Sequence, residues 1–313
     1  MLLFKLLNQF CLHFFETIFG ILICVPFFIK MSKIVGIDIG GTKMLMYSNY
    51  GGKIIQEKVP TGESATPESV VKQIHDFIGK LDYVPDAVGV CVPGLVENGT
   101  LFYASDRRNL EGISEAMIST PQYKAHIIND IRAAMYSQIP KYPKGSSICV
   151  IVVGTGIGMS VVLNGHFLSG AKGYVGEWGF CPIRLEDGTI TTYDTIITGK
   201  MIVEKCGMEP AEIVKKLDEG DERVTKIVNT AALYCGMCLS YCINLFNPDH
   251  LVFTGSTTFY KNYRQIAIET CKKYCIKESY EACEIVDPEE KGDIVIIGTQ
   301  QYARMKFEGC DMP

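Results

Sequence analysis

Two segments of the chain repeat one pattern, in which a buried strand ends in a glycine-rich turn and a second strand follows. The first contains Asp38-Ile39-Gly40-Gly41-Thr42-Lys43, and the second is Gly154-Thr155-Gly156-Ile157-Gly158. In each half another turn glycine follows eleven residues after the first, at Gly51 and at Gly165. This repeat predicts an α/β fold made of two related lobes, with a ligand cleft between them.

The glycine turns are candidate phosphate-binding sites. Residues without a Cβ let backbone N–H groups approach an anion closely. Asp38, at the end of the first strand, is a candidate to hold Mg²⁺ directly or through water. A Gly-Gly turn by itself is often an ordinary hairpin turn. Two such turns facing each other across a cleft would grip one polyphosphate, which favours the ligand-binding interpretation.

The composition is that of a globular chain without a basic surface. Of its 313 residues, 47% are apolar, which is enough to build a large core. The formal net charge is −5 at pH 7 and the basic residues form no stripe, so nucleic acid is not expected as a partner. A small anionic ligand would need a local site.

Thirteen cysteines are scattered along the chain, mostly within apolar strand or helix patterns. This distribution favours a reducing compartment, the cytoplasm, where thiols serve as small core residues. Cys235, Cys238 and Cys242 share one face of a predicted helix, so a metal site is an alternative to core packing. No second Cys or His pair in the sequence completes a zinc set.

Residues 1–30 form an apolar N-terminal extension that differs from the rest of the chain. They carry no charge between Glu16 and Lys30. Three interpretations stay open: a membrane anchor, a helix on a membrane surface, or upstream sequence before a start at Met31. The last is favoured because Met31 leads directly into the first core strand without a spacer.

From Lys33 onward, hydrophobic periodicity predicts alternating strands and helices. Strands are predicted at 34–39, 44–48, 53–59, 87–92, 125–128, 148–153, 159–163, 250–254 and 283–286. Helices are predicted at 67–78, 113–118, 130–136, 199–206, 210–217, 221–246, 260–274 and 293–305. Pro140, Pro143 and Gly145 indicate a lobe boundary. We therefore expect an N-terminal lobe of residues 31–143, a C-terminal lobe of residues 144–291, and a segment, 292–308, that packs back toward the N-terminal lobe.

Asp130 is the candidate catalytic residue. It follows Asn129 at the end of a predicted strand and opens a helix, a place where α/β folds often carry functional groups. The alternative is that Asp130 only caps the helix, a common role for Asp.

Taken in order, these motifs resemble those of the ROK family of sugar kinases and repressors, within the hexokinase, actin and Hsp70 superfamily. Asp38 to Lys43 resembles the family's first phosphate loop, residues 154–158 the second, and residues 248–255 the adenosine-binding strand and turn. Asn129-Asp130 with Ala133-Ala134 is similar to its Asn-Asp-x-x-Ala-Ala stretch. Pro93-Gly94, Asn109-Leu110-x-Gly112 and the 170–179 loop with Gly176-Glu177 resemble its sugar-contacting segments.

The resemblance implies a ribonuclease H-like fold and the ATP-dependent phosphorylation of a hexose or N-acetylhexosamine hydroxyl, with Mg²⁺. It implies that Asp130 is the general base, that Asp38 holds the Mg²⁺, and that the protein is a homodimer. Sugar contacts are expected from Asn109, Asn129, Asp130 and Glu177. Contacts to ATP and its phosphates are expected from Asp38, Gly40, Gly41, Thr42, Lys43, Gly154, Thr155, Gly156, Gly255 and Ser256. The alternative is a sugar-binding regulator or sensor of the same fold that does not phosphorylate.

The sequence departs from the family pattern at two places. Family members generally carry a His where this chain has Phe180, and then a cysteine-rich zinc motif, whereas residues 184–192 contain no cysteine. No structural zinc is therefore expected. The Glu that closes the family motif is replaced by Thr191. These changes concern the identity of the sugar more than the reaction.

Overall fold

The computed structural model describes residues 32–104, 107–185 and 187–310. From Lys33 onward the described chain packs as one compact unit. The apolar extension, residues 1–30, lies outside the described residues. The structure therefore does not test whether it is an anchor. The lobe bounds expected at residues 143 and 144 stay a prediction.

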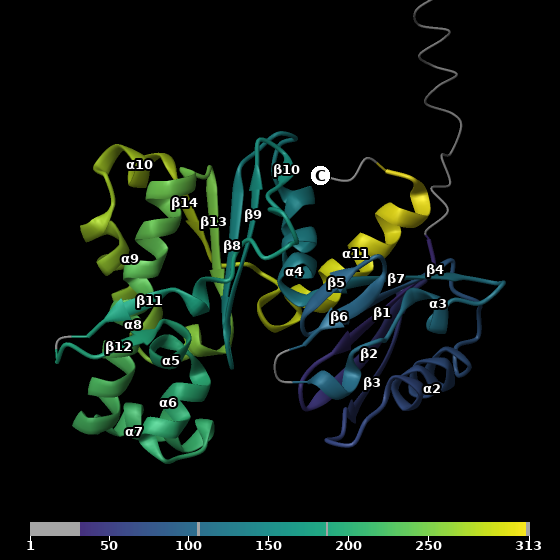
Figure 1. Ribbon diagram of the computed structural model, residues 1–313, viewed down its shortest axis with the longest axis horizontal. Helices are drawn as coiled ribbons and strands as arrows, with labels where there is room; N and C mark the ends of the chain where they lie inside the picture. The colour runs from purple at the N-terminus through teal and green to yellow at the C-terminus, as the bar shows by residue number, and fades with distance from the viewer. Residues whose placement is uncertain (1–31, 105–106, 186, 311–313) are drawn as a thin grey trace, which may run out of the picture. The chain divides into compact units, whose positions relative to one another are not determined.

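A five-stranded mixed sheet forms the first half of this unit (Figure 1). Its order is β3-β2-β1-β4-β7, in which β1, β4 and β7 run parallel while β2 and β3 are antiparallel to their neighbours. The strands are β1 (Ile34–Ile39), β2 (Lys43–Tyr50), β3 (Lys53–Pro60), β4 (Ala87–Val92) and β7 (Lys124–Asn129). All six residues of β4 are buried, as expected for a central strand with both faces covered.

The second half repeats this sheet. Its order is β10-β9-β8-β13-β14, and again the first two connections are antiparallel and the last two parallel. The strands are β8 (Ile148–Val153), β9 (Ile157–Leu163), β10 (His166–Phe167), β13 (His250–Thr254) and β14 (Glu284–Val286). The mixed α/β class and the two related halves predicted from the glycine turns are therefore confirmed.

Two helices connect the sheets. Helix α4 (Asp130–Gln138) contacts β7 of the first sheet and β8 and β9 of the second, and α11 (Ile294–Glu308) packs on α4, β1 and β4 (Figure 1). The approach is close, because a Cβ on Gly298 of α11 would lie 1.7 Å from the carbonyl oxygen of Ala133 on α4. The absence of a side chain at Gly298 lets the two helix backbones meet.

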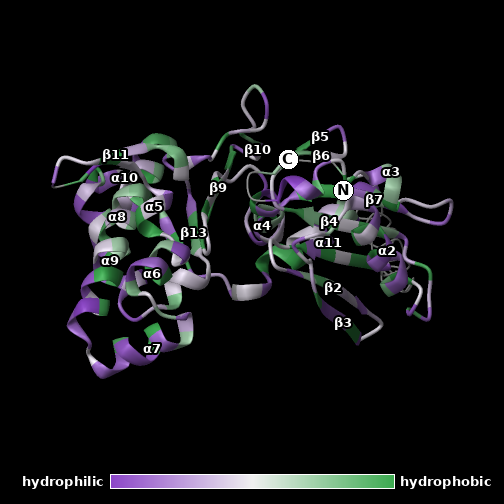
Figure 2. Cartoon of the chain, turned by 60° about the horizontal axis from the view of Figure 1, so that its bottom comes forward, coloured by the Kyte–Doolittle hydropathy of each residue, from purple (hydrophilic) through white to green (hydrophobic). Residues whose placement is uncertain are grey.

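The other helices lie away from this contact, and the longest of them fills the core of the second half. They are α2 (Pro67–Ile78), α3 (Glu115–Ile118), α5 (Asp194–Ile197), α6 (Gly199–Cys206), α7 (Pro210–Glu219), α8 (Glu222–Phe246), α9 (Tyr263–Tyr274) and α10 (Lys277–Ala282). Figure 2 shows α7 mostly hydrophilic on its visible face, whereas α8 buries an apolar row from Val224 to Ile243. Within the described chain, α8 alone is long and apolar enough to cross a membrane, but 56% of its most apolar window is buried in the protein.

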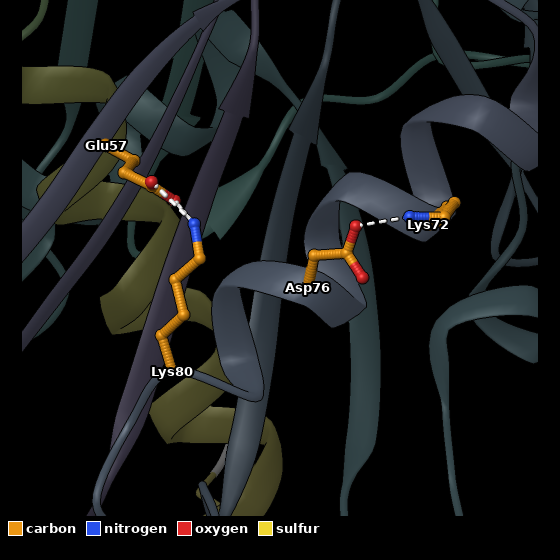
Figure 3. A network of polar contacts seen from close by, with 4 residues as sticks. All are labelled: Glu57, Lys72, Asp76 and Lys80. Carbon is orange, nitrogen blue, oxygen red and sulfur yellow. Dashed lines mark hydrogen bonds and ion pairs between the residues drawn. The ribbon is translucent and has the colours of Figure 1, made fainter.

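Figure 3 shows two ion pairs around α2. The Nζ of Lys80 lies 2.7 Å from Oε1 of Glu57 on β3, and the Nζ of Lys72 lies 2.6 Å from Oδ2 of Asp76 one helical turn further on. Both pairs are solvent-exposed, so each contributes about 0–1 kcal/mol to stability. The apolar residues of α2, such as Val70 and Ile74, do more to fix the helix on the sheet.

Two hairpins have no counterpart among the strands predicted from the sequence. β5 (Leu95–Glu97) and β6 (Thr100–Tyr103) join through Asn98 and Gly99, which both have positive φ as in a type I′ turn. β11 (Pro182–Arg184) and β12 (Ile190–Thr192) form the other hairpin. Strands of three or four residues carry too little periodicity to be recognised.

Two predicted helices begin two or three residues later than expected. Residues 113–118 were expected to be helical throughout, but α3 begins only at Glu115, because Ile113 pairs its backbone with Leu101 of the hairpin. The helix expected from residue 260 begins at Tyr263, after a 3₁₀ turn at Ser256–Phe259.

The grouped cysteines of α8 lie in the core of the second half. Cys235, Cys238 and Cys242 are fully buried beside Cys271 of α9. Burial raises the pKa of the Cys235 thiol to about 12, so it stays protonated at neutral pH. Among the described residues, no three His, Cys, Asp or Glu side chains converge as a metal site. Core packing is the interpretation that the structure favours.

Candidate active site

The first glycine turn joins β1 to β2 and is tied down at both of its ends. The Gly40 N–H donates to the Lys43 carbonyl at 2.9 Å, and the Thr61 hydroxyl donates to the Gly40 carbonyl at 2.8 Å. Gly41 and Thr42 at the tip are exposed. These two hydrogen bonds fix Gly40 at the start of the turn, while the tip residues are exposed to solvent.

The second turn has the same position between β8 and β9. The Gly154 carbonyl accepts from the Gly199 N–H at 2.7 Å and from the Thr257 hydroxyl at 3.0 Å. A carboxylate oxygen of Asp194 accepts from the Ile157 N–H at 3.2 Å. As in the first turn, the tip residues Thr155 and Gly156 stay exposed.

Asp130 lies on the first turn of α4, directly after β7. The helix cap is its neighbour Asn129, whose Oδ1 accepts from the N–H groups of Ile131 and Arg132 at 3.0 and 3.2 Å. The Asn129 side chain also donates to the Gly94 carbonyl at 2.9 Å. Asp130 itself accepts the adjacent Ile131 N–H at 2.8 Å. Capping is therefore done by Asn129.

A cleft of about 530 Å³ brings the two turns and Asp130 together. Its wall contains most of the residues predicted to bind ATP or sugar, namely Asp38, Gly40, Gly41, Thr42, Asn129, Asp130, Gly154, Thr155, Gly156 and Glu177. Residues more than a hundred positions apart in the sequence thus line one cavity, of a size that suits small-molecule ligands.

The wall of the cleft contains three carboxyl groups, those of Asp38, Asp130 and Glu177, against two arginines. The pKa of Asp130 is raised to about 6, mainly by desolvation; the charges of Asp38 and Glu177 add to the rise, while hydrogen bonds from the Ile131 N–H and the Asn129 side chain oppose it. Burial also raises the pKa of Asp38, against the opposing effects of its hydrogen bond with the Cys91 thiol and of the more remote Lys58 charge. Carboxyls with raised pKa values in a cleft are typical of functional sites.

Four of the predicted site residues lie outside the wall of this cleft. Gly255 and Ser256 adjoin the second turn, where Ser256 Oγ lies 3.6 Å from the position that a Cβ on Gly154 would take. Lys43 is exposed on β2. Asn109 is also exposed, and its amide donates to the Ala65 carbonyl at 2.7 Å, so it braces the neighbouring loop.

Three residues at the site were not predicted from the sequence. Arg107 lines the cleft, and its guanidinium donates to the Gly62 carbonyl at 2.6 Å. Cys91 contacts Asp38, and Asp194 supports the second turn. The position of Arg107 two residues before Asn109 was the available signal, whereas Cys91 looked like any other buried cysteine.

The region that departs from the family pattern forms the β11–β12 hairpin. Phe180, which replaces the usual His, is 71% exposed. Thr191 pairs with Ile183 within the hairpin, and its hydroxyl contacts that of Thr195. Neither Phe180 nor Thr191 lines the cleft.

Two repeated α/β halves, each presenting a glycine turn to a common cleft, define the actin/hexokinase-like class of fold. The model of the ROK family matches residues 34–304, and the chain belongs to this family.

Known proteins of the family include both kinases and repressors. An N-acetylmannosamine kinase of Haemophilus influenzae (strain 86-028NP) is 25% identical over 295 residues, which cover 87% of this chain and 95% of that protein. The xylose repressor of Bacillus subtilis (strain 168) is 22% identical over 72% of this chain and 65% of the repressor. Among solved structures, a ROK family glucokinase from Streptomyces griseus, in complex with glucose and AMPPNP, matches with a TM-score of 0.72 and 18% identity, covering 88% of this chain and all (100%) of that one.

Proposed function

We propose that this protein is an ATP-dependent kinase that phosphorylates a hydroxyl of a hexose or N-acetylhexosamine. The observation that carries the proposal is the placement of Asp130, with its pKa raised to about 6, in a cleft that both glycine turns line. The similarity to N-acetylmannosamine kinases and to a ROK glucokinase supports the choice of substrate class.

Asp130 is the general base in this proposal. A carboxylate whose pKa lies near the working pH is a competent base and still gives up its proton readily afterwards. Asn129 holds the first turn of α4 in place through its hydrogen bonds to Ile131, Arg132 and Gly94. These bonds fix the backbone position of Asp130. Asp130 would accept the proton of the sugar hydroxyl as that oxygen bonds to phosphorus.

The glycine turns would bind the phosphates of ATP. Phosphoryl transfer depends mostly on positioning and on charge neutralisation, which backbone N–H groups and a metal ion can supply. A divalent cation fits this site, because Asp38 and Asp130 are two desolvated carboxyls close enough for one charge to raise the pKa of the other. Asp38 would hold Mg²⁺, which neutralises phosphate charge when bound.

The sugar would lie between Asp130 and Glu177. Asn129, Asp130 and Glu177 offer donors and acceptors to hydroxyl groups from the wall of the cleft. Asn109 would act indirectly, by supporting the loop that carries Arg107. Movement of the lobes toward each other would exclude water during transfer.

The first test is turnover by the purified protein on a panel of hexoses and N-acetylhexosamines with ATP and Mg²⁺. ADP release would be followed beside an Asp130→Asn variant, which keeps the oxygen that accepts the Ile131 N–H. We expect turnover on one sugar to fall by at least about a thousandfold in the variant, while sugar affinity changes little. Near-normal turnover in the variant would show that the base is wrongly assigned.

A sugar-binding regulator is the second candidate, favoured by the similarity to the xylose repressor. It predicts sugar binding without ADP release on any member of the panel. The presence of Asp130 in the cleft is the reason to prefer the kinase.

We propose the cytoplasm as the compartment, because the described cysteines are free thiols, as a reducing environment allows. The homodimer implied by the family resemblance stays a prediction, and light scattering on the purified protein tests it.

A further inference from the structure

A second cavity, of about 630 Å³, adjoins the cleft at the start of α4, where Asn129 and Arg132 line both. It is bounded by β5, β7, α4, α11 and the loop around Lys172. The cleft and this cavity share only Leu95, Asn129, Arg132 and Gly173 in their walls. Nothing in the proposed reaction uses its remaining residues.

The cavity carries an excess of positive charge in a protein whose formal net charge is −5. Arg132, Lys172 and Lys306 line it, and none of the ion pairs between described residues uses them. The carboxylate in the wall is Glu115, which accepts the Ile127 N–H at 2.9 Å. Three cations against one carboxylate favour an anionic ligand.

Two of the three cations, Arg132 and Lys306, lie against neighbouring aromatic rings. The guanidinium of Arg132 lies 4.8 Å from the Phe167 ring centroid and donates to Ser169 Oγ at 2.9 Å. The Nζ of Lys306 lies 5.6 Å from the ring centroid of Tyr302. Tyr302 packs in turn on Tyr136, with 5.0 Å between centroids. These rings form an apolar wall beside the charges.

His126 completes the polar side of the cavity. Its Nδ1 lies 4.0 Å from Glu115 Oε1. Burial lowers the pKa of His126 and the nearby Lys306 charge lowers it too, while Glu115 raises it. A neutral imidazole can donate one hydrogen bond and accept another, which suits hydroxyl groups.

We propose that this cavity is a regulatory site for a sugar phosphate. The cations fit a phosphate monoester, the tyrosine rings fit the face of a sugar ring, and Glu115, His126 and Asn98 fit its hydroxyls. The site is coupled to the cleft through Asn129 and Arg132, because these residues border both cavities and flank Asp130 in the sequence. A ligand that draws the Arg132 side chain toward it acts on the helix turn that carries Asp130.

Binding is tested on the full-length protein by calorimetry without nucleotide, using glucose 6-phosphate, N-acetylmannosamine 6-phosphate and inorganic phosphate. The variant is Lys172→Gln with Lys306→Gln, and the matched control is Lys272→Gln with Lys273→Gln on α9. We expect the first pair to weaken binding of one sugar phosphate by about tenfold or more, since two charged contacts to the phosphate are lost. The control pair should leave it unchanged.

Several results would overturn the proposal. Equal binding by the Lys172/Lys306 variant and its control would mean that sugar phosphates do not use this cavity. Competition between the sugar phosphate and the free sugar in both proteins would place it in the cleft instead. If inorganic phosphate binds with the same affinity as the sugar phosphate, the sugar ring contributes nothing to recognition. None of these readings needs turnover, so they are independent of the kinase proposal.

Occupancy of this cavity is tested by NMR of the histidine ring protons, and the regulatory role by kcat. Sugar phosphate should shift the His126 signals and raise the pKa of His126 in the native protein and in the control, because a nearby anion favours imidazolium. It should not do so in the Lys172/Lys306 variant. If turnover is found, kcat should change with sugar phosphate in the control but not in this variant, and an unchanged kcat in both would overturn the regulatory role.

Discussion

Asp130 sits in an environment that suits a base but opposes stability. An ordinary Asp has a pKa near 3.9, whereas desolvation at the foot of the cleft raises the pKa of Asp130 to about 6. At neutral pH the protein must therefore keep a carboxylate charged in a place that resists charge. The nearby Asp38 and Glu177 carboxylates add to this opposition. A residue chosen for folding alone would be neutral here.

The pH dependence of kcat/KM for the sugar should report this environment. Because the base must be deprotonated, kcat/KM should fall as pH drops below about 6, the pKa of Asp130 in the free protein. Initial rates between pH 5 and 8 measure the inflection. In Glu177→Gln the inflection should move to lower pH, because one repelling charge is gone. A profile that is flat over this range would contradict the assignment of Asp130.

The same raised pKa predicts that Asp130→Asn stabilises the fold. The folded-state pKa of about 6 exceeds the unfolded value near 3.9, so charging Asp130 costs stability, fully above pH 6 and not at all below about pH 4. We expect the free energy of unfolding of the variant to rise by about 1–3 kcal/mol at pH 7.5. Denaturant unfolding at pH 7.5 and 4.5 measures it. A gain of equal size at both pH values would contradict the electrostatic cause.

At the scale of elements, helix α4 carries the candidate base and contacts both sheets. Its first turn carries Asp130 into the cleft, its middle packs on α11, and its flanks contact strands of both sheets. The second glycine turn also rests on it, because a Cβ on Gly158 would meet the side chain of Ile131 at 2.2 Å. Displacing α4 would therefore disturb the base and the second turn together.

The contact between α4 and α11 predicts the effect of Gly298→Ala. Alanine is the better helix former by about 1 kcal/mol, but its Cβ would fall 1.7 Å from the Ala133 carbonyl oxygen. The helices must move apart, so we expect a net loss of about 1–3 kcal/mol in the free energy of unfolding.

Gly292→Ala, just before α11, is the matched control because its Cβ would meet nothing within 4 Å. Chemical denaturation of both variants gives the comparison. Gly298→Ala as stable as the control would mean that the two helices are less closely packed than described.

At the scale of the whole molecule, the described chain from Lys33 onward is one compact unit that contains the cleft and the second cavity. The hydrophobic clusters of the two sheets are separate, and α4 and α11 lie between them. The kinase proposal includes movement of the halves toward each other, and with separate cores such a movement would leave each core intact. This arrangement fits a reaction that requires opening for exchange and closure for transfer.

A protein that begins at Met31 should keep the full function of this unit. We expect its melting temperature and its affinities for sugar and for a non-hydrolysable ATP analogue to match those of the full chain, because the cleft is built from residues after Lys33. Thermal unfolding and calorimetry on both proteins, in the same detergent-containing buffer, make the comparison. Loss of ligand binding in the shorter protein would show that residues 1–30 take part in the site.

The sequence by itself determined most strands of the two main sheets, most of the helices, the repeat of two halves and the glycine turns, because these depend on local periodicity and on residues such as Gly40 and Gly154 whose backbone freedom is local. Only the tertiary structure decided which of the candidate residues line the same cleft. It brought Asp38, Asp130 and Glu177 together, left Asn109 bracing a loop, and added Arg107 and Cys91 to the site. Desolvation and the convergence of charges depend on side chains that are distant in sequence. The raised pKa of Asp130 and the second cavity therefore exist only once the chain has folded.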